Sequence, residues 1–420
     1  MRLITEKVNI GSGSLVIGGG SPIVVQTMCN THTDDVEGTL AQCRRMVAAG
    51  AEMIRITVPG LQDVPHIREI RERLRAEGIM VPIVADIHFS AQTAIEVARF
   101  VDKVRINPGN FHKDHQMARA KFLQLLEVCK AHGTAIRIGI NHGSLGEYIT
   151  NLYGNTPKAM AEAAMEWVRM CVQADFRKVV ISLKSSNTAS MVQGYRALVQ
   201  MMKAEGVVFP LHVGVTEAGG GDSGRIKSCV GIATLLEEGI GDTVRVSLTE
   251  DPVNELPVAR YLAARYSSAP MPQLPERELK MLDAACTWGP KLLRHEVDSI
   301  EEEMEPYLRD EIMQAARRRF YKPEYIACPG CGRTMYDLQK AYREVMEKTA
   351  CFKDIVIAIM GCIVNGPGEM ADADWGYVGE GGGKVSIYKK NVPVLRHVPE
   401  DEAPDRLVAL IREDLKAQGK

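Results

Sequence analysis

Short apolar segments alternate with amphipathic segments along the first 265 residues of the chain. The run "PIVVQTM" at 22–28 is rich in β-branched residues, and Val36, Leu40 and Val47 follow it at helical spacing. This pair of patterns predicts one strand and one helix. The other apolar runs that precede a helical pattern are "MIRITVP", "VPIVADI", "KVRINPG", "AIRIGINHG", "KVVISLKSS", "PLHVGVTEAG" and "TVRVSLT". Near-continuous apolar strands between amphipathic helices indicate a parallel sheet that is buried on both faces.

Eight such units over about 250 residues match the size of a closed (β/α)8 TIM barrel. An open doubly wound sheet is the alternative architecture. After Tyr266 the strand pattern stops, and a loop-like and then partly helical connector is predicted for 266–323. The last segment, 324–420, reads as a small α+β domain. The predicted fold class is therefore α/β, with a (β/α)8 TIM barrel at 1–265 followed by a small α+β domain.

The composition changes this picture little. With 45% hydrophobic and 25% charged residues the chain is typical of a globular protein, and its net charge of −2 argues against a nucleic-acid surface. No apolar run approaches the roughly 18 residues of a membrane span, and the first residues resemble neither a signal peptide nor an anchor. Most of the ten cysteines lie in apolar periodic segments, which favours reduced thiols and a cytoplasmic location.

Several predicted strands carry a cation in their later part, where barrel active sites form. These cations are Arg55, Arg105, Arg137, Lys184 and Arg245. Because side chains two or four apart share a face of a strand, they and the nearby Asn107, Asn141 and Ser247 are expected to point into one cavity. Unpaired buried guanidinium groups are costly, so an anion or several carboxylates must lie opposite them.

Few acidic residues are available to balance these cations: Asp86, next to His88 in "ADIHF", and Glu217 in "VTEAG". A layer of Arg–Glu pairs that plugs the barrel is the structural alternative. The excess of positive charge favours a phosphate or diphosphate substrate, because arginine binds phosphate oxygens in a bidentate manner. A glycine pattern at 219–224 imitates a dinucleotide fingerprint, but it falls in the seventh unit and is interpreted as a phosphate cradle.

The small domain contains a Cys-x-x-Cys pair, Cys328 and Cys331 in "CPGCGRT", and a third cysteine, Cys362, in "GCIVNGPGE". Turns of this kind expose backbone N–H groups to the sulfurs of an iron-sulfur cluster. A zinc site would need a fourth ligand, for which Cys351 and His397 are available. A thiol redox pair would leave Cys362 unexplained. The spacing favours a cluster over zinc and zinc over a dithiol, and all three stay open.

"CPGCGRT" together with "GCIVNGPGE" resembles the cluster domain of the 4-hydroxy-3-methylbut-2-enyl diphosphate synthase family, from the methylerythritol phosphate route to isoprenoids. The resemblance extends into the barrel, where "VQTM", "VRINPGN", "IRIGINHGSL", "VTEAG" and "VRVSL" stand in family order. It covers most of 20–250 and 325–395. Two departures are Cys29, where the family usually has Thr, and a longer connector than in the shorter bacterial relatives.

The resemblance implies one 4Fe-4S cluster per chain, held by Cys328, Cys331, Cys362 and Glu369, with Glu369 as an exchangeable carboxylate ligand. It also implies reductive ring opening of 2-C-methyl-D-erythritol 2,4-cyclodiphosphate. The residues expected to bind this substrate are Arg55, Arg105, Asn107, Arg137, Asn141, Lys184, Thr216, Arg245 and Ser247. Glu217 is the candidate proton donor, and Asp86 and His88 are expected to orient neighbouring groups.

The family resemblance further implies electron delivery by a ferredoxin or flavodoxin, and a homodimer in which one subunit's cluster domain covers the other's barrel. Two other functions stay open from the residues alone. One is a barrel with a structural zinc module that binds a partner. The other is a nonreductive sugar-phosphate lyase or isomerase.

Overall fold

The computed structural model describes residues 2–11, 13, 15–364 and 366–417, so Asn365 of the "GCIVNGPGE" turn and the end of the predicted last domain, 418–420, lie outside it. Its main sheet has eight strands in the order β8-β7-β6-β5-β4-β3-β10-β9, with parallel pairing throughout. A parallel bridge between Ile181 of β8 and Leu211, the residue before β9, joins the two ends. The sheet is therefore closed, which confirms the (β/α)8 barrel and excludes an open sheet.

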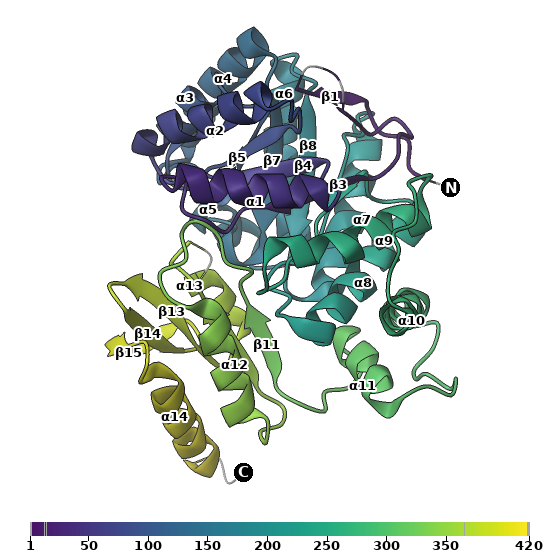
Figure 1. The fold of residues 1–420 in the computed structure, drawn as a ribbon, viewed down its shortest axis with the longest axis vertical. Helices are drawn as coiled ribbons and strands as arrows, with labels where there is room; N and C mark the ends of the chain where they lie inside the picture. The colour runs from purple at the N-terminus through teal and green to yellow at the C-terminus, as the bar shows by residue number, and fades with distance from the viewer. Residues whose placement is uncertain (1, 12, 14, 365, 418–420) are drawn as a thin grey trace.

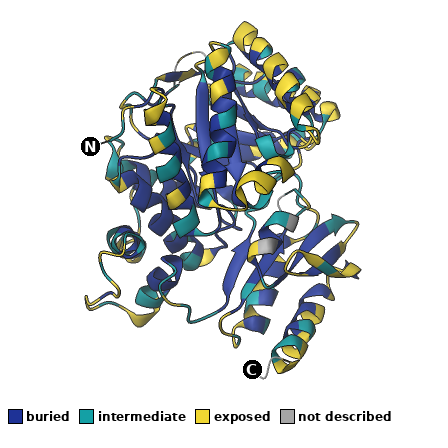
Figure 2. Cartoon of the chain, turned by 180° about the vertical axis from the view of Figure 1, so that it is seen from behind, coloured by how far each residue is buried: buried dark blue, intermediate teal, exposed yellow. Residues whose placement is uncertain are grey.

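The barrel strands are β3 (Val24–Met28), β4 (Met53–Thr57), β5 (Ile83–Asp86), β6 (Lys103–Ile106), β7 (Ala135–Asn141), β8 (Val179–Lys184), β9 (His212–Val213) and β10 (Thr243–Val244). The helices around them are α1 (Val36–Ala48), α2 (Val64–Ala76), α3 (Ala91–Val97), α4 (His115–His132), α6 (Pro157–Gln173), α7 (Thr188–Ala204), α8 (Gly221–Glu237) and α9 (Glu255–Tyr266), with a short α5 (Glu147–Tyr153) before α6. Figure 2 shows the strands buried at the centre and exposed residues on the outer faces of the helices. Strands β9 and β10 are shorter than their apolar runs predict.

Local sequence signals place the helix ends. The side chain of Ser90 accepts a hydrogen bond from the N–H of Thr93 at the start of α3, and Pro157 occupies the first turn of α6. Gly133 ends α4 with a φ of 70°, a left-handed conformation that glycine adopts without strain. These caps set the lengths of the helices and therefore which strand ends reach the mouth of the barrel.

An N-terminal hairpin, β1 (Val8–Ile10) and β2 (Leu15–Ile17), covers the amino end of the barrel. Its apolar side chains form one cluster with residues at the starts of the barrel strands, among them Val24, Met53 and Val84. This hairpin was not predicted, because its two strands have only three residues each. It closes one end of the barrel with apolar contacts, so the polar residues of the interior are accessible from the carboxyl end of the strands.

The connector packs on the barrel rather than crossing solvent. Helices α10 (Glu276–Leu293) and α11 (Pro306–Ala315) lie against α8, and Leu282, Cys286 and Ile312 belong to the same hydrophobic core as the barrel. Much of the length of this segment is therefore used in packing.

The C-terminal domain is a five-stranded sheet in the order β11-β12-β13-β14-β15. Its strands are β11 (Glu324–Ala327), β12 (Val356–Met360), β13 (Trp375–Gly381), β14 (Lys384–Lys389) and β15 (Val392–Pro399), of which the first three pair in parallel and the last three antiparallel. Its helices are α12 (Leu338–Thr349), the one-turn α13 (Gly366–Glu369) and α14 (Ala403–Ala417). This confirms the small α+β domain. Figure 1 shows it below the barrel, with α13 facing the barrel loops.

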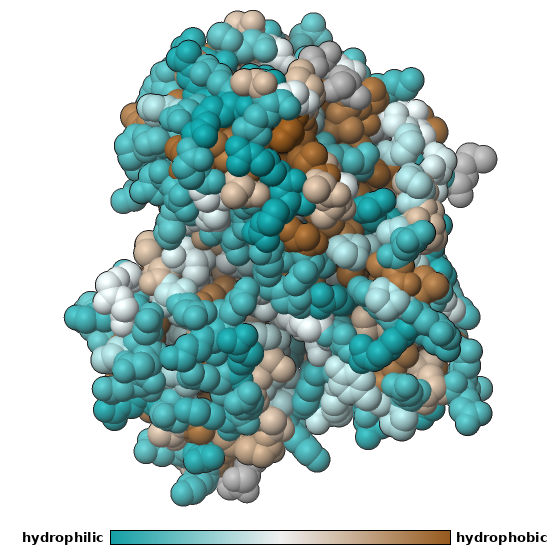
Figure 3. Space-filling view, in the orientation of Figure 1, coloured by the Kyte–Doolittle hydropathy of each residue, from teal (hydrophilic) through white to brown (hydrophobic). Residues whose placement is uncertain are grey.

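In the space-filling view the barrel and the C-terminal domain form two lobes, and hydrophilic residues cover most of the visible face (Figure 3). Among the described residues no helix combines the length and the apolar character that a membrane span requires.

Candidate functional site

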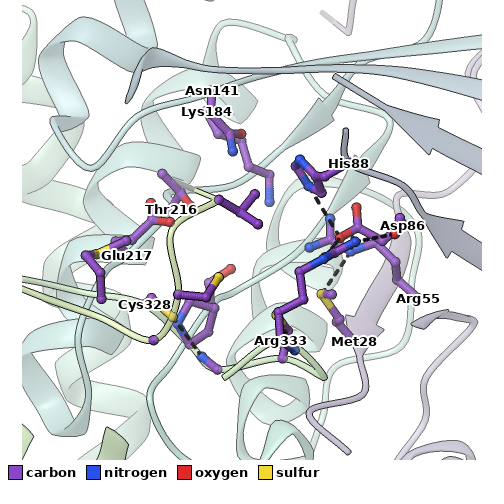
Figure 4. A pocket seen from close by; sticks show the side chains of 18 of the residues that line it. Met28, Arg55, Asp86, His88, Asn141, Lys184, Thr216, Glu217, Cys328 and Arg333 are labelled. Carbon is purple, nitrogen blue, oxygen red and sulfur yellow. Dashed lines mark hydrogen bonds and ion pairs between the residues drawn. The ribbon is translucent and has the colours of Figure 1, made fainter. Parts of the chain in front are cut away.

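A cavity of about 70 Å³ lies between the carboxyl ends of the barrel strands and the C-terminal domain. Most of the predicted site residues line it, namely Arg55, Asp86, His88, Arg105, Asn141, Lys184, Thr216, Glu217, Arg245 and Ser247 from the barrel and Cys328, Cys331 and Cys362 from the C-terminal domain. Figure 4 shows these groups converging from several strands and from the loop after β11. Residues far apart in the sequence are thus brought to one place.

Asp86, the last residue of β5, is the acidic centre of the basic mouth. Its carboxylate accepts a hydrogen bond from Nη1 of Arg105 at 3.1 Å and lies 3.8 Å from Nε of Arg55. Burial opposes its ionisation, but Arg55 and Arg105 outweigh this effect and hold the pKa of Asp86 well below its usual range. Asp86 is therefore a fixed negative charge that positions two guanidinium groups.

His88 is buried next to these groups. Its Nε2 faces Arg105, and its Nδ1 lies 2.8 Å from the side-chain amide of Asn110. Burial, and after it the charge of Arg105, lowers the pKa of His88 to about 3. The imidazole is neutral at physiological pH and acts as a hydrogen-bonding group.

Arg245 is held by an acidic residue that the sequence reasoning missed. Its Nη2 and Nε donate to the two carboxylate oxygens of Glu255 at 3.1 and 3.2 Å, and Glu255 also accepts a hydrogen bond from Thr27 at 3.0 Å. Both partners are almost fully buried. A carboxylate at the first turn of α9 gives no signal in the sequence that separates it from a solvated helix start.

The side-chain ammonium of Lys184 forms no hydrogen bond or ion pair in the part of the chain that the structure describes, although the residue is only 5% exposed. Burial and the neighbouring Arg245 lower the pKa of Lys184 well below its ordinary value. Four arginines and Lys184 line the cavity, against the carboxylates of Asp86, Glu217 and the adjoining Glu255, so basic groups are in excess. Such an excess stabilises a bound polyanion.

Two predicted substrate ligands and one predicted cluster ligand do not line the cavity: Asn107, Arg137 and Glu369. Asn107 instead joins two loops, since its side chain donates to Ser144 at 2.8 Å and accepts from the N–H of Gly109 at 3.0 Å. Arg137 is completely buried in the barrel, where it donates to Ser182 at 3.2 Å.

Glu217 lies in the loop after β9 in a strained backbone conformation. Its φ is 48°, in the left-handed region that non-glycine residues rarely adopt, and its carbonyl accepts a hydrogen bond from the N–H of Ala327 at 3.2 Å. This contact continues as a parallel bridge between Ala218 and Ala327, so the first strand of the C-terminal domain extends a barrel loop. Strain of this kind concentrates at functional sites.

The three cysteines form the opposite wall of the cavity. The N–H of Gly330 donates to Sγ of Cys328 at 3.3 Å, and the N–H of Arg333 donates to Sγ of Cys331 at 3.4 Å. Such bonds stabilise negative charge on sulfur. Burial raises the pKa of the Cys328 thiol, and burial followed by the charge of Cys331 raises that of Cys362 to about 11, so a cation beside them is needed to hold them as thiolates.

Glu369, at the end of α13, is fully buried next to the barrel. One carboxylate oxygen accepts a hydrogen bond from Ser186 at 3.2 Å, while the other has no hydrogen-bond partner among the described residues. Burial, and then the charge of Glu217, raises its pKa well above the ordinary value. A buried carboxylate oxygen without a hydrogen-bond partner fits a position next to a cationic group.

Close backbone packing holds α13 against the barrel. A Cβ atom on Gly368 would lie 1.4 Å from the carbonyl oxygen of Gly143, in the short helix η3 (His142–Ser144), so a side chain cannot be accommodated there. Next to this contact, His142 pairs with Asp372 at 2.9 Å. Gly368 of "NGPGE" therefore allows the close approach of Glu369 to the barrel.

The donor set fits an iron-sulfur cluster better than a single metal ion. No group of three or more His, Cys, Asp or Glu side chains among the described residues converges on one ion. A cubane binds each ligand through a different iron, so its ligands surround a volume rather than a point. The zinc ligands considered above are elsewhere, since Cys351 is exposed and does not line the cavity and His397 pairs with Glu380.

Arg333, the other residue that the sequence reasoning missed, crosses from the C-terminal domain to the barrel. It donates through Nη1 to the carboxylate of Asp86 at 3.1 Å and through Nη2 to its backbone carbonyl at 2.8 Å, as Figure 4 shows. Its position within "CPGCGRT", directly after the cysteine pair, is the signal that could have identified it.

The predicted phosphate cradle at 219–224 is wrong. The N–H of Gly221 donates to Glu250 at 2.8 Å, the N–H of Gly220 donates to the hydroxyl of Tyr342 at 3.3 Å, and none of these glycines lines the cavity. Because side chains of the protein already occupy these N–H groups, the turn serves the packing of the two domains.

Comparison with known proteins shows similarity over almost the whole chain. The family model described as the GcpE TIM-barrel domain matches residues 5–260, and the one described as the GcpE protein C-terminal domain matches residues 324–413. A 4-hydroxy-3-methylbut-2-en-1-yl diphosphate synthase (ferredoxin) from Synechococcus sp. strain CC9902 is 42% identical, with 98% of this chain and 94% of the relative covered. A flavodoxin-type synthase from Bacteroides thetaiotaomicron is 35% identical, with 99% and 98% covered.

Proposed function

The chain belongs to the GcpE family of 4-hydroxy-3-methylbut-2-en-1-yl diphosphate synthases, and we propose that the cavity between its two domains is the active site of this reaction. The enzyme is an oxidoreductase that reductively opens 2-C-methyl-D-erythritol 2,4-cyclodiphosphate and removes a hydroxyl group to give 4-hydroxy-3-methylbut-2-enyl diphosphate. The observation that carries the proposal is a cluster of buried cations facing three cysteine thiols across one cavity.

The cations bind the diphosphate. Arg55, Arg105 and Arg245 present guanidinium forks, and Lys184 adds a charge that no carboxylate of the described residues neutralises. Asn141, Thr216 and Ser247 line the same cavity and supply hydrogen bonds. We also count Arg137 and Asn107 among the substrate-binding residues, although neither lines the cavity. Arg137 adds positive potential from inside the barrel, and Asn107 fixes the position of a loop.

The substrate enters only when the domains separate. The cavity of about 70 Å³ is far below the roughly 300 Å³ at which ligand pockets begin. Closure then excludes water, which strengthens the electrostatic interactions inside. The contacts that must open for this include those of Arg333 with Asp86 and of His142 with Asp372.

Members of this family depend on iron and sulfur, and we propose that one 4Fe-4S cluster per chain is held by Cys328, Cys331, Cys362 and Glu369. Three thiols that line one cavity and a buried carboxylate oxygen without a partner support this ligand set. When bound, the cluster supplies single electrons and one iron whose hard carboxylate ligand exchanges more readily than a thiolate. Glu369 is counted as catalytic because it is the proposed ligand that exchanges.

The proposed proton donor and the groups that orient its neighbours come from the barrel. Glu217 lines the cavity and is assigned as the donor that protonates the departing hydroxyl group. Asp86 holds Arg55 and Arg105 in place, and neutral His88 fixes the orientation of Arg105.

The named relatives use flavodoxin or ferredoxin, and an electron donor of this kind is proposed for this chain. A cytoplasmic homodimer is proposed from the family resemblance, which implies that one subunit's cluster domain covers the other's barrel; within this single chain the C-terminal domain meets its own barrel through Arg333 and Asp86. We place the domain boundaries at 1–265, 266–323 and 324–420.

The experiment is anaerobic purification followed by analysis for iron and sulfide, electron paramagnetic resonance after dithionite reduction, and turnover of the cyclic diphosphate. About four iron and four sulfide per chain and turnover that requires a reductant are expected. Colourless protein that binds one zinc would support the structural zinc module instead. Turnover without a reductant would support a nonreductive lyase or isomerase.

A further inference from the structure

A second cavity, of about 420 Å³, opens to the surface beside the cysteines. It shares His88, Arg333, Cys362 and Val364 with the substrate cavity, so these four residues stand between the two. Cys362 therefore has one side toward the substrate and another toward a surface opening. Its volume falls within the range of cavities that accept small organic groups.

The rim of the second cavity is apolar and exposed. Phe89, Met335 and Ile363 line it and are 58%, 47% and 62% exposed. They come from the loop after β5, from the loop before α12 and from the residue after Cys362. Large exposed apolar side chains that gather around one opening mark a site of interaction rather than a random surface.

Phe89 has a strained backbone conformation as well as an exposed side chain. Its φ of 61° lies in the left-handed region, and its N–H donates to the carbonyl of Asn110 at 3.0 Å. Such a conformation is unfavourable for a residue other than glycine. Because the ring is exposed, it gains no burial within the chain that could offset the strain. A partner that covers the ring would bury it and offset the strain.

The charge of the lining also selects the occupant. Among the described residues that form this cavity none is acidic, whereas Arg333, His32 and His88 are basic or polar. Because the lining contains no acidic residue and its rim is apolar, the opening suits a flat group with an apolar edge. The dimethylbenzene edge of a flavin is flat and apolar, and the negative charge of the reduced flavin lies at the other end of the ring system, whereas a ferredoxin surrounds its cluster with backbone and presents no such edge.

We propose that a flavodoxin docks on this rim and places the dimethylbenzene edge of its reduced flavin in the cavity beside Cys362. The inference rests on the proposed function, since it assigns the surface through which that site receives electrons. The rim combines barrel residues with residues of the C-terminal domain, so it is complete only when the domains are closed. Electrons are then delivered only to a closed enzyme.

The balance of the reaction requires two docking events per turnover. Each flavin hydroquinone loses one electron and becomes a semiquinone. The substrate gains two electrons and two protons, one carbon–oxygen bond to the ring phosphate breaks, and the hydroxyl group leaves as water. Each spent flavodoxin must therefore dissociate, for which a small, largely apolar rim is better suited than a large interface.

The test measures binding separately from turnover. Full-length, cluster-loaded protein is titrated with a purified oxidised bacterial flavodoxin by calorimetry. Phe89→Asn removes the ring but tolerates the left-handed backbone, and Met335→Gln keeps the size of the side chain. Each is expected to raise the Kd at least tenfold. Leu123→Gln, at an exposed apolar residue of α4, is the matched control and leaves the Kd unchanged.

Turnover driven by dithionite is expected to be unchanged in Phe89→Asn and Met335→Gln, whereas turnover driven by flavodoxin falls in parallel with binding. Unchanged flavodoxin binding in both variants overturns the proposal. The proposal is also overturned if the two variants weaken the binding of a 2Fe-2S ferredoxin but not that of flavodoxin. It is overturned as well if light scattering shows that the variants lose dimers while flavodoxin binding is unchanged. If wild-type protein binds flavodoxin but dithionite drives no turnover, the proposed function fails while the docking surface stands.

Discussion

Arg333 and Asp86 join the two domains at the centre of the active site, with hydrogen bonds of 3.1 Å to the carboxylate and 2.8 Å to the backbone carbonyl. The same carboxylate holds Arg105 at 3.1 Å, and the backbone N–H of Arg333 donates to Cys331 at 3.4 Å. One side chain thus connects the position of the cysteine loop with that of the substrate-binding guanidinium groups. Closing the domains and ordering the basic mouth become a single event.

Replacement of Arg333 by Met is expected to lower kcat/KM by about 30-fold. The physical reason is the loss of about 2 kcal/mol of closure energy, at the low end for removal of one partner of a buried charged pair, because Asp86 keeps Arg105 and Arg55. Arg333→Lys should recover part of the loss, since an ammonium group retains the charge but not the fork. Steady-state kinetics with dithionite as reductant measure both variants.

The radius of gyration and the iron content together distinguish a loss of domain closure from damage to the cysteine loop. In Arg333→Met the radius of gyration from X-ray scattering should rise, while the iron content stays that of the wild type. Arg343→Met, at an exposed arginine of α12, is the control and should change neither quantity. An Arg333→Met protein that stays closed and loses iron would show that the residue supports the cysteine loop instead.

The barrel could be predicted from the sequence because its signal is local and repeated. Apolar strands such as "KVVISLKSS" differ clearly from the amphipathic helices around them, and a parallel sheet buried on both faces requires this pattern. The hairpin at Val8–Ile10 and Leu15–Ile17 gave no such signal, because three-residue strands are too short for a period to be read. The strand at Trp375–Gly381 could not be predicted from the sequence either, because it contains three glycines, which strands usually lack.

The members of the site could be predicted, but not all their contacts. A cation in an apolar strand stands out, so Arg55, Arg105 and Arg245 were found from the sequence. Glu255 was missed because it follows Glu250 and Asp251 at a helix start, and Arg333 because a single arginine in a loop is ordinarily explained by solvation. Only the tertiary structure brings them within hydrogen-bonding distance of Arg245 and Asp86.

Two cysteines of the C-terminal domain should respond differently to the same substitution. Cys362→Ser is expected to lower the iron and sulfide content to below half of the wild-type value and to abolish turnover, because Cys362 lines the cavity with the other two thiols. Cys351→Ser should keep both, since Cys351 is exposed and does not line that cavity. Circular dichroism checks that both variants are folded. Iron loss in Cys351→Ser alone would contradict the ligand set.

Replacement of Glu255 by Gln should destabilise the barrel by about 3 kcal/mol, because it leaves the guanidinium of Arg245 buried without a countercharge. The KM for the cyclic diphosphate should also rise, since Arg245 loses its fixed orientation. Glu250→Gln removes a similar partner from Arg225 at the same end of the barrel, but that pair is partly exposed and should cost about 1 kcal/mol or less. Urea unfolding of the two variants measures the difference. Equal losses would show that burial of the Arg245 pair is not decisive.

The buried imidazole of His88 should make the stability of the protein depend on pH in acid. In the folded protein burial, and after it Arg105, lowers its pKa to about 3, whereas an unfolded chain binds the proton near pH 6.5. Between these values the unfolded state carries one more proton, so the contribution of His88 to the free energy of unfolding falls by about 1.4 kcal/mol for each unit by which the pH decreases. Above pH 6.5 it is constant.

His88→Gln removes this titration and keeps a carbonyl oxygen that accepts a hydrogen bond from Arg105. The free energy of unfolding of the cluster-free protein, measured in urea between pH 4.5 and 6, should therefore fall less steeply in the variant than in the wild type, by close to one proton. His132→Gln, at an exposed position at the end of α4, controls for the exchange of a histidine as such. If His88→Gln and the wild type share one slope, the imidazole is not held neutral, and the hydrogen bond that orients Arg105 must come from another group.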